Sequence, residues 1–144
     1  MKVAQILKVK GHAVMTVRPT ESIKLLAQRL RLENVGAMIV SENGSSIDGI
    51  ISERDVAHGI AEHGNALLEM AVADVMTRAV VTCANDDRIA DVAKIMTRRR
   101  IRHLPVKDGT KLVGVISVGD VVKHRLDEME LEAHVLRDYA IASH

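Results

Sequence analysis

Aromatic side chains are almost absent from this chain of 144 residues, which has one tyrosine, Tyr139, and neither phenylalanine nor tryptophan. Proteins that bind single-stranded nucleic acid stack the bases on aromatic rings, so this class is disfavoured. The single cysteine, Cys83, cannot form an internal disulfide, which indicates a reducing compartment. No apolar run is long enough to span a membrane, and the segment 1–8 does not resemble a signal peptide. We therefore expect a cytoplasmic protein.

Charge of one sign is also lacking, because 20 basic residues nearly cancel 19 acidic ones and the net charge is +1. The acidic stretch Asp127 to Glu132 argues against DNA as a partner. The histidines are scattered, and none stands at a spacing that suits a metal site. There is no glycine-rich phosphate loop and no Ser-His-Asp arrangement that the spacing supports. We expect neither a metal centre nor a catalytic site.

The chain does contain an internal repeat. The segment Ala13-Val14-Met15-Thr16 is similar in sequence to Ala79-Val80-Val81-Thr82, and the segment 49–56 is similar to 114–121. The offset is 66 residues at Val40 and Val106 (106 − 40) and 65 at Gly44 and Gly109 (109 − 44). Units of this length are small α+β units rather than solenoid repeats. We expect one repeat over 1–66 and another over 67–144, paired about a pseudo-twofold axis with a cleft between them.

The two repeats have the same expected order of elements, β-α-β-β-α. Apolar residues at helical spacing follow each first strand, and Asn-Gly or Asp-Gly between apolar runs predicts a hairpin in each repeat. Ser22 or Thr20 is expected to cap the helix of the first repeat, and Asp86 or Asp87 that of the second. The predicted strands are 13–17, 37–41 and 47–52 in the first repeat, and 79–83, 103–107 and 112–117 in the second.

A long helix is expected at the C-terminus, from about Asp120 to Tyr139. Its apolar residues follow alternating steps of four and three, which is the pattern of a narrow coiled-coil seam. The sequence leaves open whether the seam packs on its own domain or against a second copy. The residues of the seam are Val122, Leu126, Met129, Ala133, Leu136 and Ala140.

A repeated Ser-x-x-Asp pattern, Ser52 with Asp55 and Ser117 with Asp120, carries the most specific chemistry. Each serine ends a strand, and each aspartate falls in the first turn of the next helix. Such a pair either caps the helix or binds a polyol, with the carboxylate accepting hydrogen bonds from two ribose hydroxyls. Its occurrence twice, each time after Gly-apolar-apolar, favours the binding role.

These residues also carry a family resemblance. Gly49-Ile50-Ile51-Ser52-Glu53-Arg54-Asp55 and Gly114-Val115-Ile116-Ser117-Val118-Gly119-Asp120, with Arg102-His103-Leu104-Pro105-Val106 opening the second hairpin, resemble tandem CBS (cystathionine β-synthase) domains, the Bateman module. The resemblance covers nearly the whole chain and implies a stand-alone, non-catalytic sensor. It further implies an α+β (α/β) fold, clefts for AMP, ADP, ATP, NAD or S-adenosylmethionine, a homodimer and an unidentified regulated protein. AMP is the ligand we expect first.

The resemblance also implies which residues line each cleft. In the first cleft, Ser117 and Asp120 would hold the ribose, Arg102 and His103 would face phosphate, and the base would lie among Val14, Val35, Gly36 and Ala37. In the second cleft, Ser52 and Asp55 would hold the ribose, Arg54 would lie near phosphate, and the base would lie among Val80, Ile101 and Arg102. Where the second repeat has Arg102 and His103, the first has Gly36 and Ala37, which carry no charge. Since phosphate recognition favours arginine, the first cleft, with Arg102 and His103 facing phosphate, is the stronger expected site.

Two further readings stay open at this stage. The clefts are an enzyme site if Asp55 or Asp120 acts as a base, although no activating group accompanies either. Alternatively, the clefts are structural and the C-terminal helix docks a partner. The basic run Arg98-Arg99-Arg100 suits a helix C-terminus, and one of its side chains is an additional candidate for phosphate contact.

Overall fold

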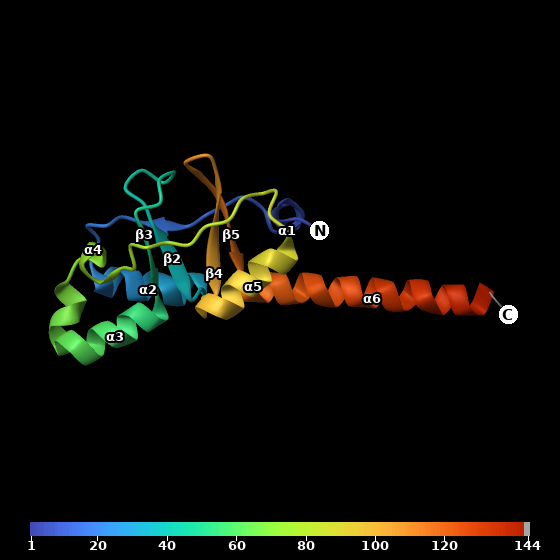
Figure 1. Ribbon diagram of the computed structural model, residues 1–144. Coiled ribbons are helices and arrows are strands. Elements are labelled where there is room, and N and C mark those ends of the chain that lie inside the picture. The colour runs from blue at the N-terminus through green and yellow to red at the C-terminus, as the bar shows by residue number, and fades with distance from the viewer. Residues whose placement is uncertain (143–144) are drawn as a thin grey trace.

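The protein, described by a computed structural model over residues 1–142, consists of two small sheets that lie side by side, with helices along one side of them (Figure 1). The last two residues of the predicted second repeat, 143 and 144, lie outside the described residues. A single long helix, α6 (Val118–Ala142), extends away from this body. The α+β fold expected from the repeat is confirmed. Although α6 is long, no helix within residues 1–142 is long and apolar enough to cross a membrane.

The first repeat has the predicted order of elements. Helix α2 (Ile23–Glu33) begins after Ser22, whose hydroxyl accepts a hydrogen bond from the Leu25 backbone N–H, so the predicted cap is confirmed. Strand β1 (Thr16–Val17) is shorter than predicted and pairs in parallel with β2 (Ala37–Val40). Strand β3 (Gly49–Ser52) pairs antiparallel with β2 and leads directly into helix α3 (Glu53–His63).

The second repeat keeps the helix and the hairpin but loses its first strand. Helix α5 (Ile89–Arg99) precedes the antiparallel strands β4 (His103–Asp108) and β5 (Lys111–Ser117). The strand predicted over 79–83 is reduced to one parallel bridge between Cys83 and Val106. The neighbouring Pro105 has no N–H group and cannot donate the next hydrogen bond of a ladder, so the pairing cannot extend further towards Val81.

The predicted cap of α5 was wrong. The residue before the helix is Arg88, which makes no side-chain capping hydrogen bond. The Asp87 carboxylate instead accepts a hydrogen bond from the Ala84 backbone N–H at 2.8 Å, which closes the turn that leads into the helix. An aspartate bonded in this way satisfies the backbone of its own turn rather than the free N–H groups of the helix.

The two repeats exchange short helices. Val3, Ile6 and Leu7 of α1 (Val3–Lys10) are buried in the core of the second repeat. The 3-10 helix η1 (Gly64–Glu69) and α4 (Val72–Val75) bury Leu67 and Val72 in the core of the first repeat. The division at residue 66 therefore separates the repeats in sequence but not in packing. The exchange ties the two units together, since neither core is complete without a helix that precedes or follows it in the chain.

Leu7 should be one of the residues on which this exchange depends most. It is fully buried, and its methyl groups lie so close to Gly114 that a Cβ added there would meet them at 2.7 Å. We expect Leu7→Ala to lower the free energy of unfolding by about 2–5 kcal/mol, because it leaves a cavity between α1 and β5. Urea unfolding measures this change. Val9→Ala is the control, since Val9 is 85% exposed on the same helix and its loss should change stability by less than about 0.5 kcal/mol.

Candidate ligand-binding site

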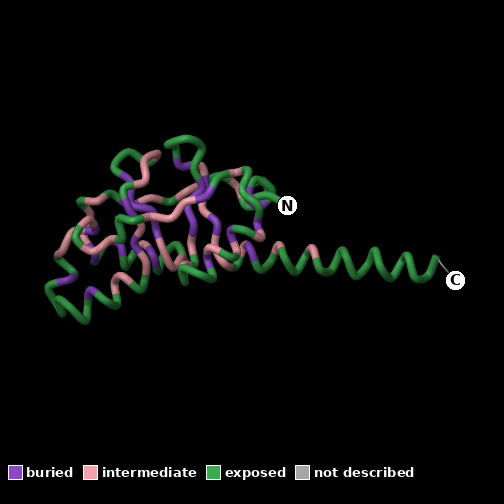
Figure 2. The backbone as a smooth tube through the Cα atoms, viewed as in Figure 1, coloured by how far each residue is buried: buried purple, intermediate pink, exposed green. Residues whose placement is uncertain are grey.

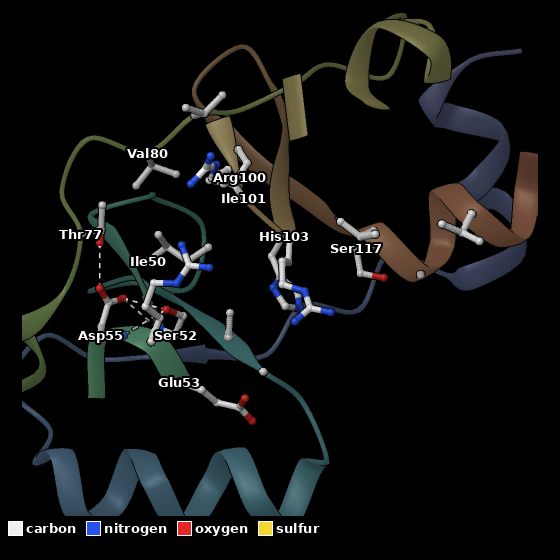
Figure 3. A pocket seen from close by; sticks show the side chains of 18 of the residues that line it. Ile50, Ser52, Glu53, Asp55, Thr77, Val80, Arg100, Ile101, His103 and Ser117 are labelled. Carbon is white, nitrogen blue, oxygen red and sulfur yellow. Dashed lines mark hydrogen bonds between the residues drawn. The ribbon is translucent and has the colours of Figure 1, made fainter. Parts of the chain in front are cut away.

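A cavity of about 860 Å³ opens between the two repeats (Figure 3). Its wall includes the ends of the hairpin strands, the first turns of α3 and α6, and the irregular segment where the lost strand was expected. The structure thus brings together most of the binding residues predicted from the sequence. These are Gly36, Ala37, Ser52, Arg54, Asp55, Val80, Ile101, Arg102, His103 and Ser117.

The Asp55 carboxylate is held at one side of this cavity by three hydrogen bonds from two neighbours, Ser52 and Thr77. Its Oδ2 atom accepts hydrogen bonds from the Ser52 backbone N–H at 2.9 Å and from the Ser52 hydroxyl at 3.1 Å. Its Oδ1 atom accepts a hydrogen bond from the Thr77 hydroxyl at 3.1 Å, drawn as a dashed line in Figure 3. The Ser52 hydroxyl also accepts from the Asp55 backbone N–H, so the pair forms a capping box for α3. The capping and binding roles are therefore compatible, because a carboxylate has about four acceptor positions.

Aliphatic side chains form the part of the wall nearest to Asp55. Ile50 and Val80 lie close to it, with Ile101 beyond them (Figure 3). Val81 and Ala79 also line the cavity, on the segment that Pro105 prevents from joining the sheet. Since the described residues that line the cavity include no phenylalanine, tyrosine or tryptophan, a flat base would be held between these aliphatic side chains and the backbone.

Sequence reasoning missed several residues of the cavity. Thr77 was not predicted, because at the offset of 66 residues its counterpart in the first repeat is Gly11 (77 − 66), so the repeat gives no signal at this position. The first turns of α6 were also missed, because the seam was assigned to packing only. The missed residues are Ile50, Glu53, Thr77, Ala79, Val81, Val118, Gly119, Val122, Lys123, Leu126 and Asp127.

Arg100 is the one residue of the basic run that lines the cavity. It follows the last residue of α5 with φ at 53°, in the left-handed region, which is uncommon for a residue other than glycine. Asn34 holds the corresponding position after α2, also at φ 53°, and asparagine adopts this conformation more readily than arginine. The left-handed turn ends the helix and lets the Arg100 side chain face the cavity beside Ile101 (Figure 3).

His103 lies on the other side of the cavity, near Ser117 (Figure 3). Burial lowers the pKa of His103 below its usual value, and the nearby charges of Lys10 and Arg102 lower it further. Asp120 and Glu53 oppose this shift only in part. At neutral pH His103 is therefore uncharged and acts as a hydrogen-bonding group rather than a cation. The guanidinium groups of Arg54, Arg100 and Arg102 therefore supply the positive charge of the wall, while an uncharged His103 keeps one N–H donor with which to face a phosphate.

Three of the predicted residues do not line this cavity. Val35 lines a separate hollow of about 590 Å³ beside α2 and α3, and Val14 lies outside both. Asp120 is engaged elsewhere, because the Lys10 ammonium lies 2.7 Å from its Oδ2 atom. Burial alone would raise the pKa of Asp120, but hydrogen bonds from Lys10 and from the Ser117 backbone, together with the Lys10 charge, bring that pKa below its usual value. The carboxylate is thus ionised and already paired.

Lys10 donates a hydrogen bond to the Asp120 carboxylate, as Thr77 does to the Asp55 carboxylate. A Cβ on Gly49 would meet Met76 and one on Gly114 would meet Leu7, so α1 and α4 occupy equivalent places. Thr77 donates its backbone N–H to the Ile50 carbonyl at 2.9 Å and its hydroxyl to Asp55.

In the second repeat α1 runs on as a helix to Lys10 instead. The Lys10 ammonium donates to the Val115 carbonyl at 2.9 Å and to the Asp120 carboxylate. Val115 and Asp120 are the repeat equivalents of Ile50 and Asp55. One flexible cation therefore replaces two donors, and the two carboxylates face different surroundings.

Redox and metal chemistry find little support among the described residues. Cys83 is buried, and burial, with a smaller effect of the Asp87 charge, raises the pKa of its thiol to about 12. A thiol of this kind is inert as a nucleophile. Within residues 1–142, no group of three or more His, Cys, Asp or Glu side chains is placed to hold a metal ion.

Comparison with known protein families identifies the fold. The model of the CBS domain matches residues 8–62 and again residues 72–127, once in each repeat. The chain belongs to the CBS domain family. The two repeats thus form a CBS pair, and the cavity lies between its halves.

Relatives of this CBS pair include bacterial and archaeal proteins. The crystal structure of the CBS-domain-containing protein ATU1752 from Agrobacterium tumefaciens is 38% identical with a TM-score of 0.84, covering 87% of this chain and 99% of that one. The CBS pair of protein MJ0100, crystallised with 5′-methylthioadenosine and S-adenosyl-L-methionine, is 25% identical with a TM-score of 0.77, covering 89% and 98%. The uncharacterised protein MK0525 of Methanopyrus kandleri is 28% identical over 85% of this chain, which spans 63% of that protein.

Proposed function

We propose that this CBS pair is a regulatory module that binds an adenosine ligand in the cavity beside Asp55. The observation that carries the proposal is the Asp55 carboxylate, fixed by Ser52 and Thr77 on the wall of a cavity of about 860 Å³. The related CBS pair of MJ0100 was crystallised with two adenosine compounds, which supports the same class of ligand for this chain.

The proposed ligand uses three parts of the wall. Its base lies between Ile50, Val80 and Ile101, and its ribose hydroxyls donate to the Asp55 carboxylate. A carboxylate that accepts two hydroxyl hydrogen bonds makes charge-assisted contacts, which are stronger than neutral ones. The Thr77 hydroxyl, which now donates to Asp55, then turns or shares that acceptor with the ribose.

The remainder of the ligand points to the cationic part of the cavity. Arg54, Arg100 and Arg102 line it together with Lys123, and guanidinium groups match phosphate oxygens in a bidentate manner. This composition favours a phosphorylated ligand, with AMP first and ADP, ATP and NAD as the larger members of the class. S-adenosylmethionine is the competing ligand without phosphate.

We propose the Asp55 cleft rather than the Asp120 cleft as the principal site. The Asp120 carboxylate is paired with the Lys10 ammonium, so a ribose would have to displace a charged donor at 2.7 Å. The Asp55 carboxylate has only the neutral Thr77 hydroxyl at the corresponding place. This preference reverses the order expected from the arginine of the first cleft.

The proposed regulatory role rests on which elements form the wall of the cavity. The ligand contacts side chains of both repeats and of α6, so its binding energy favours one relative position of these parts. A partner protein that contacts the same parts then senses the occupied state. We propose a non-catalytic, cytoplasmic module with no nucleic-acid or membrane partner. Among the described residues that line the cavity, no hydrogen bond joins His103 to a serine or threonine hydroxyl, so no activated nucleophile is in place.

Native mass spectrometry and isothermal titration calorimetry test the proposal. We expect an adenosine compound to be released when the purified protein is denatured, or one equivalent of AMP, ADP, ATP, NAD or S-adenosylmethionine to bind the ligand-free protein. Guanosine monophosphate is the control for the base, and adenine alone is the control for the ribose. An empty protein that gives no heat with any of these adenosine compounds would disprove the proposal.

A further inference from the structure

The seam of α6 is uncovered in the described chain. We define the C-terminal seam as Val122, Leu126, Met129, Ala133 and Leu136. Leu126, Met129 and Leu136 are 59%, 63% and 68% exposed, and Figure 2 shows α6 exposed along nearly all of its length beyond the body. The alternative that the seam packs on its own domain is therefore wrong, apart from Val122 and Leu126, which also line the cavity.

An isolated helix of this kind needs a partner. Helices stripped of tertiary contacts are marginal in water even when they are longer than a dozen residues, because their stability comes from burying an apolar face. The seam follows steps of four, three, four and three, so its side chains form one narrow stripe along the helix. A second helix with the same repeat fits this stripe, whereas a flat surface would leave its flanks uncovered.

We propose that the C-terminal seam pairs in parallel with the same seam of a second copy of this chain. In a parallel pair, the residue just before Leu126 or Ala133 occupies the heptad position g. It faces the residue five places later on the partner helix, which occupies position e. Arg125 then faces the partner's Glu130, and Glu132 faces the partner's Arg137. Both contacts join opposite charges, and the twofold symmetry of the pair forms each of them twice.

Within residues 1–142, one ion pair competes with this pairing, and it is weak. Arg125 lies 3.2 Å from Glu128 of its own helix, and the Arg125 side chain is 58% exposed. Exposed ion pairs of this kind contribute little, so Arg125 can turn to the partner's Glu130 at small cost.

Antiparallel pairing over the same length is opposed by charge. It would place Lys123 opposite the partner's Arg137, and would set Glu130 and Glu132 each against its own copy. Like charges across an interface disfavour the wrong arrangement. A shift by seven residues restores opposite charges but leaves part of the seam exposed in each helix. Parallel pairing is the arrangement that both covers the seam and matches the charges.

The pairing places the two ligand cavities at the same end of the paired helices. Val122 and Leu126 belong both to the seam and to the cavity wall, so the second copy lies beside the mouth of each cavity. The pairing itself does not depend on the proposed ligand, since it rests on the seam and its flanking charges alone.

Cysteine cross-linking tests the parallel arrangement in the full chain. In a parallel pair Leu136 faces its own copy, so Leu136→Cys should form a disulfide-linked dimer in most chains under mild oxidation. Leu131→Cys is the matched control, since Leu131 is 63% exposed on the opposite side of the same helix and should cross-link far less. The native Cys83 is buried and adds no background.

Three results would overturn the proposal. The first is a wild-type protein that stays monomeric by light scattering at the concentration of the cross-linking experiment. The second is equal cross-linking of Leu136→Cys and Leu131→Cys. The third is a mixture of Leu126→Cys and Leu136→Cys chains that links only between the two variants, because that pattern shows antiparallel pairing.

Discussion

Asp55→Ala should weaken the binding of an adenosine ligand by about 100-fold or more. The substitution removes the carboxylate that accepts the ribose hydroxyls, and each hydrogen bond to a charged group contributes about 1.5–3 kcal/mol. Two such bonds lost together amount to about two powers of ten in the dissociation constant. Isothermal titration calorimetry with AMP, or with whichever compound the purified protein releases, measures the change directly.

Asp120→Ala is the matched control for this experiment. Both aspartates accept a hydrogen bond from a serine backbone N–H at the start of a helix, at 2.9 Å in each case, so both substitutions weaken a cap. Only Asp55 faces the cavity. Asp55→Asn tests the charge without shortening the side chain, in case the alanine variant folds poorly. If Asp120→Ala loses the ligand while Asp55→Ala and Asp55→Asn retain it, the proposed position of the ligand is wrong.

Lys10→Met should raise the number of adenosine ligands bound per chain from one to two. The variant removes the ammonium that occupies the Asp120 carboxylate and the Val115 carbonyl, while its side chain keeps a similar length and remains on α1. Asp120 then offers the ribose an unpaired acceptor, as Asp55 does. Calorimetry measures the stoichiometry, and native mass spectrometry counts the ligands on each chain.

Lys8→Met is the control, because Lys8 lies in the same last turn of α1, whereas the ammonium that pairs with Asp120 is that of Lys10. It should leave the stoichiometry at one. A Lys10→Met protein that is folded by circular dichroism and still binds a single ligand contradicts the prediction. The unequal clefts would then be due to the helical turn itself and not to its charge.

The elements with strong local signals were predicted well. The Asn-Gly and Asp-Gly turns and the apolar runs beside them located both hairpins, because strand pairing across a short turn is determined within about 15 residues. The cap of α2 at Ser22 was predicted for the same reason. The prediction of a strand over 79–83 was wrong. The pairing of this segment depends on the neighbouring strand β4, where Pro105 lacks the backbone N–H that the next hydrogen bond needs.

The residues of the candidate site were likewise predicted only where a local sequence pattern marks them. The Ser-x-x-Asp pairs and the residues around Arg102 could be chosen from the repeat, because both carry patterns that survive in the sequence. The different surroundings of the Asp55 and Asp120 carboxylates could not be predicted from the repeat. They depend on Lys10 lying beside Asp120, which are 110 residues apart and meet only because α1 joins the core of the second repeat. No local pattern indicates which core a terminal helix will join.

The sequence by itself determined that this chain is a tandem repeat of α+β units, that each unit presents a serine and an aspartate at the end of a strand, and that a helix with an apolar seam follows. These properties reside in periodicity, turn residues and repeated motifs, which act over short distances along the chain. The tertiary structure decided which carboxylate faces an open cavity, which carboxylate is paired with a lysine, and that Met129 and Leu136 of the seam stay exposed within residues 1–142. Those outcomes depend on packing and charge between segments that are distant in sequence, where a single side chain such as Lys10 determines which carboxylate is paired.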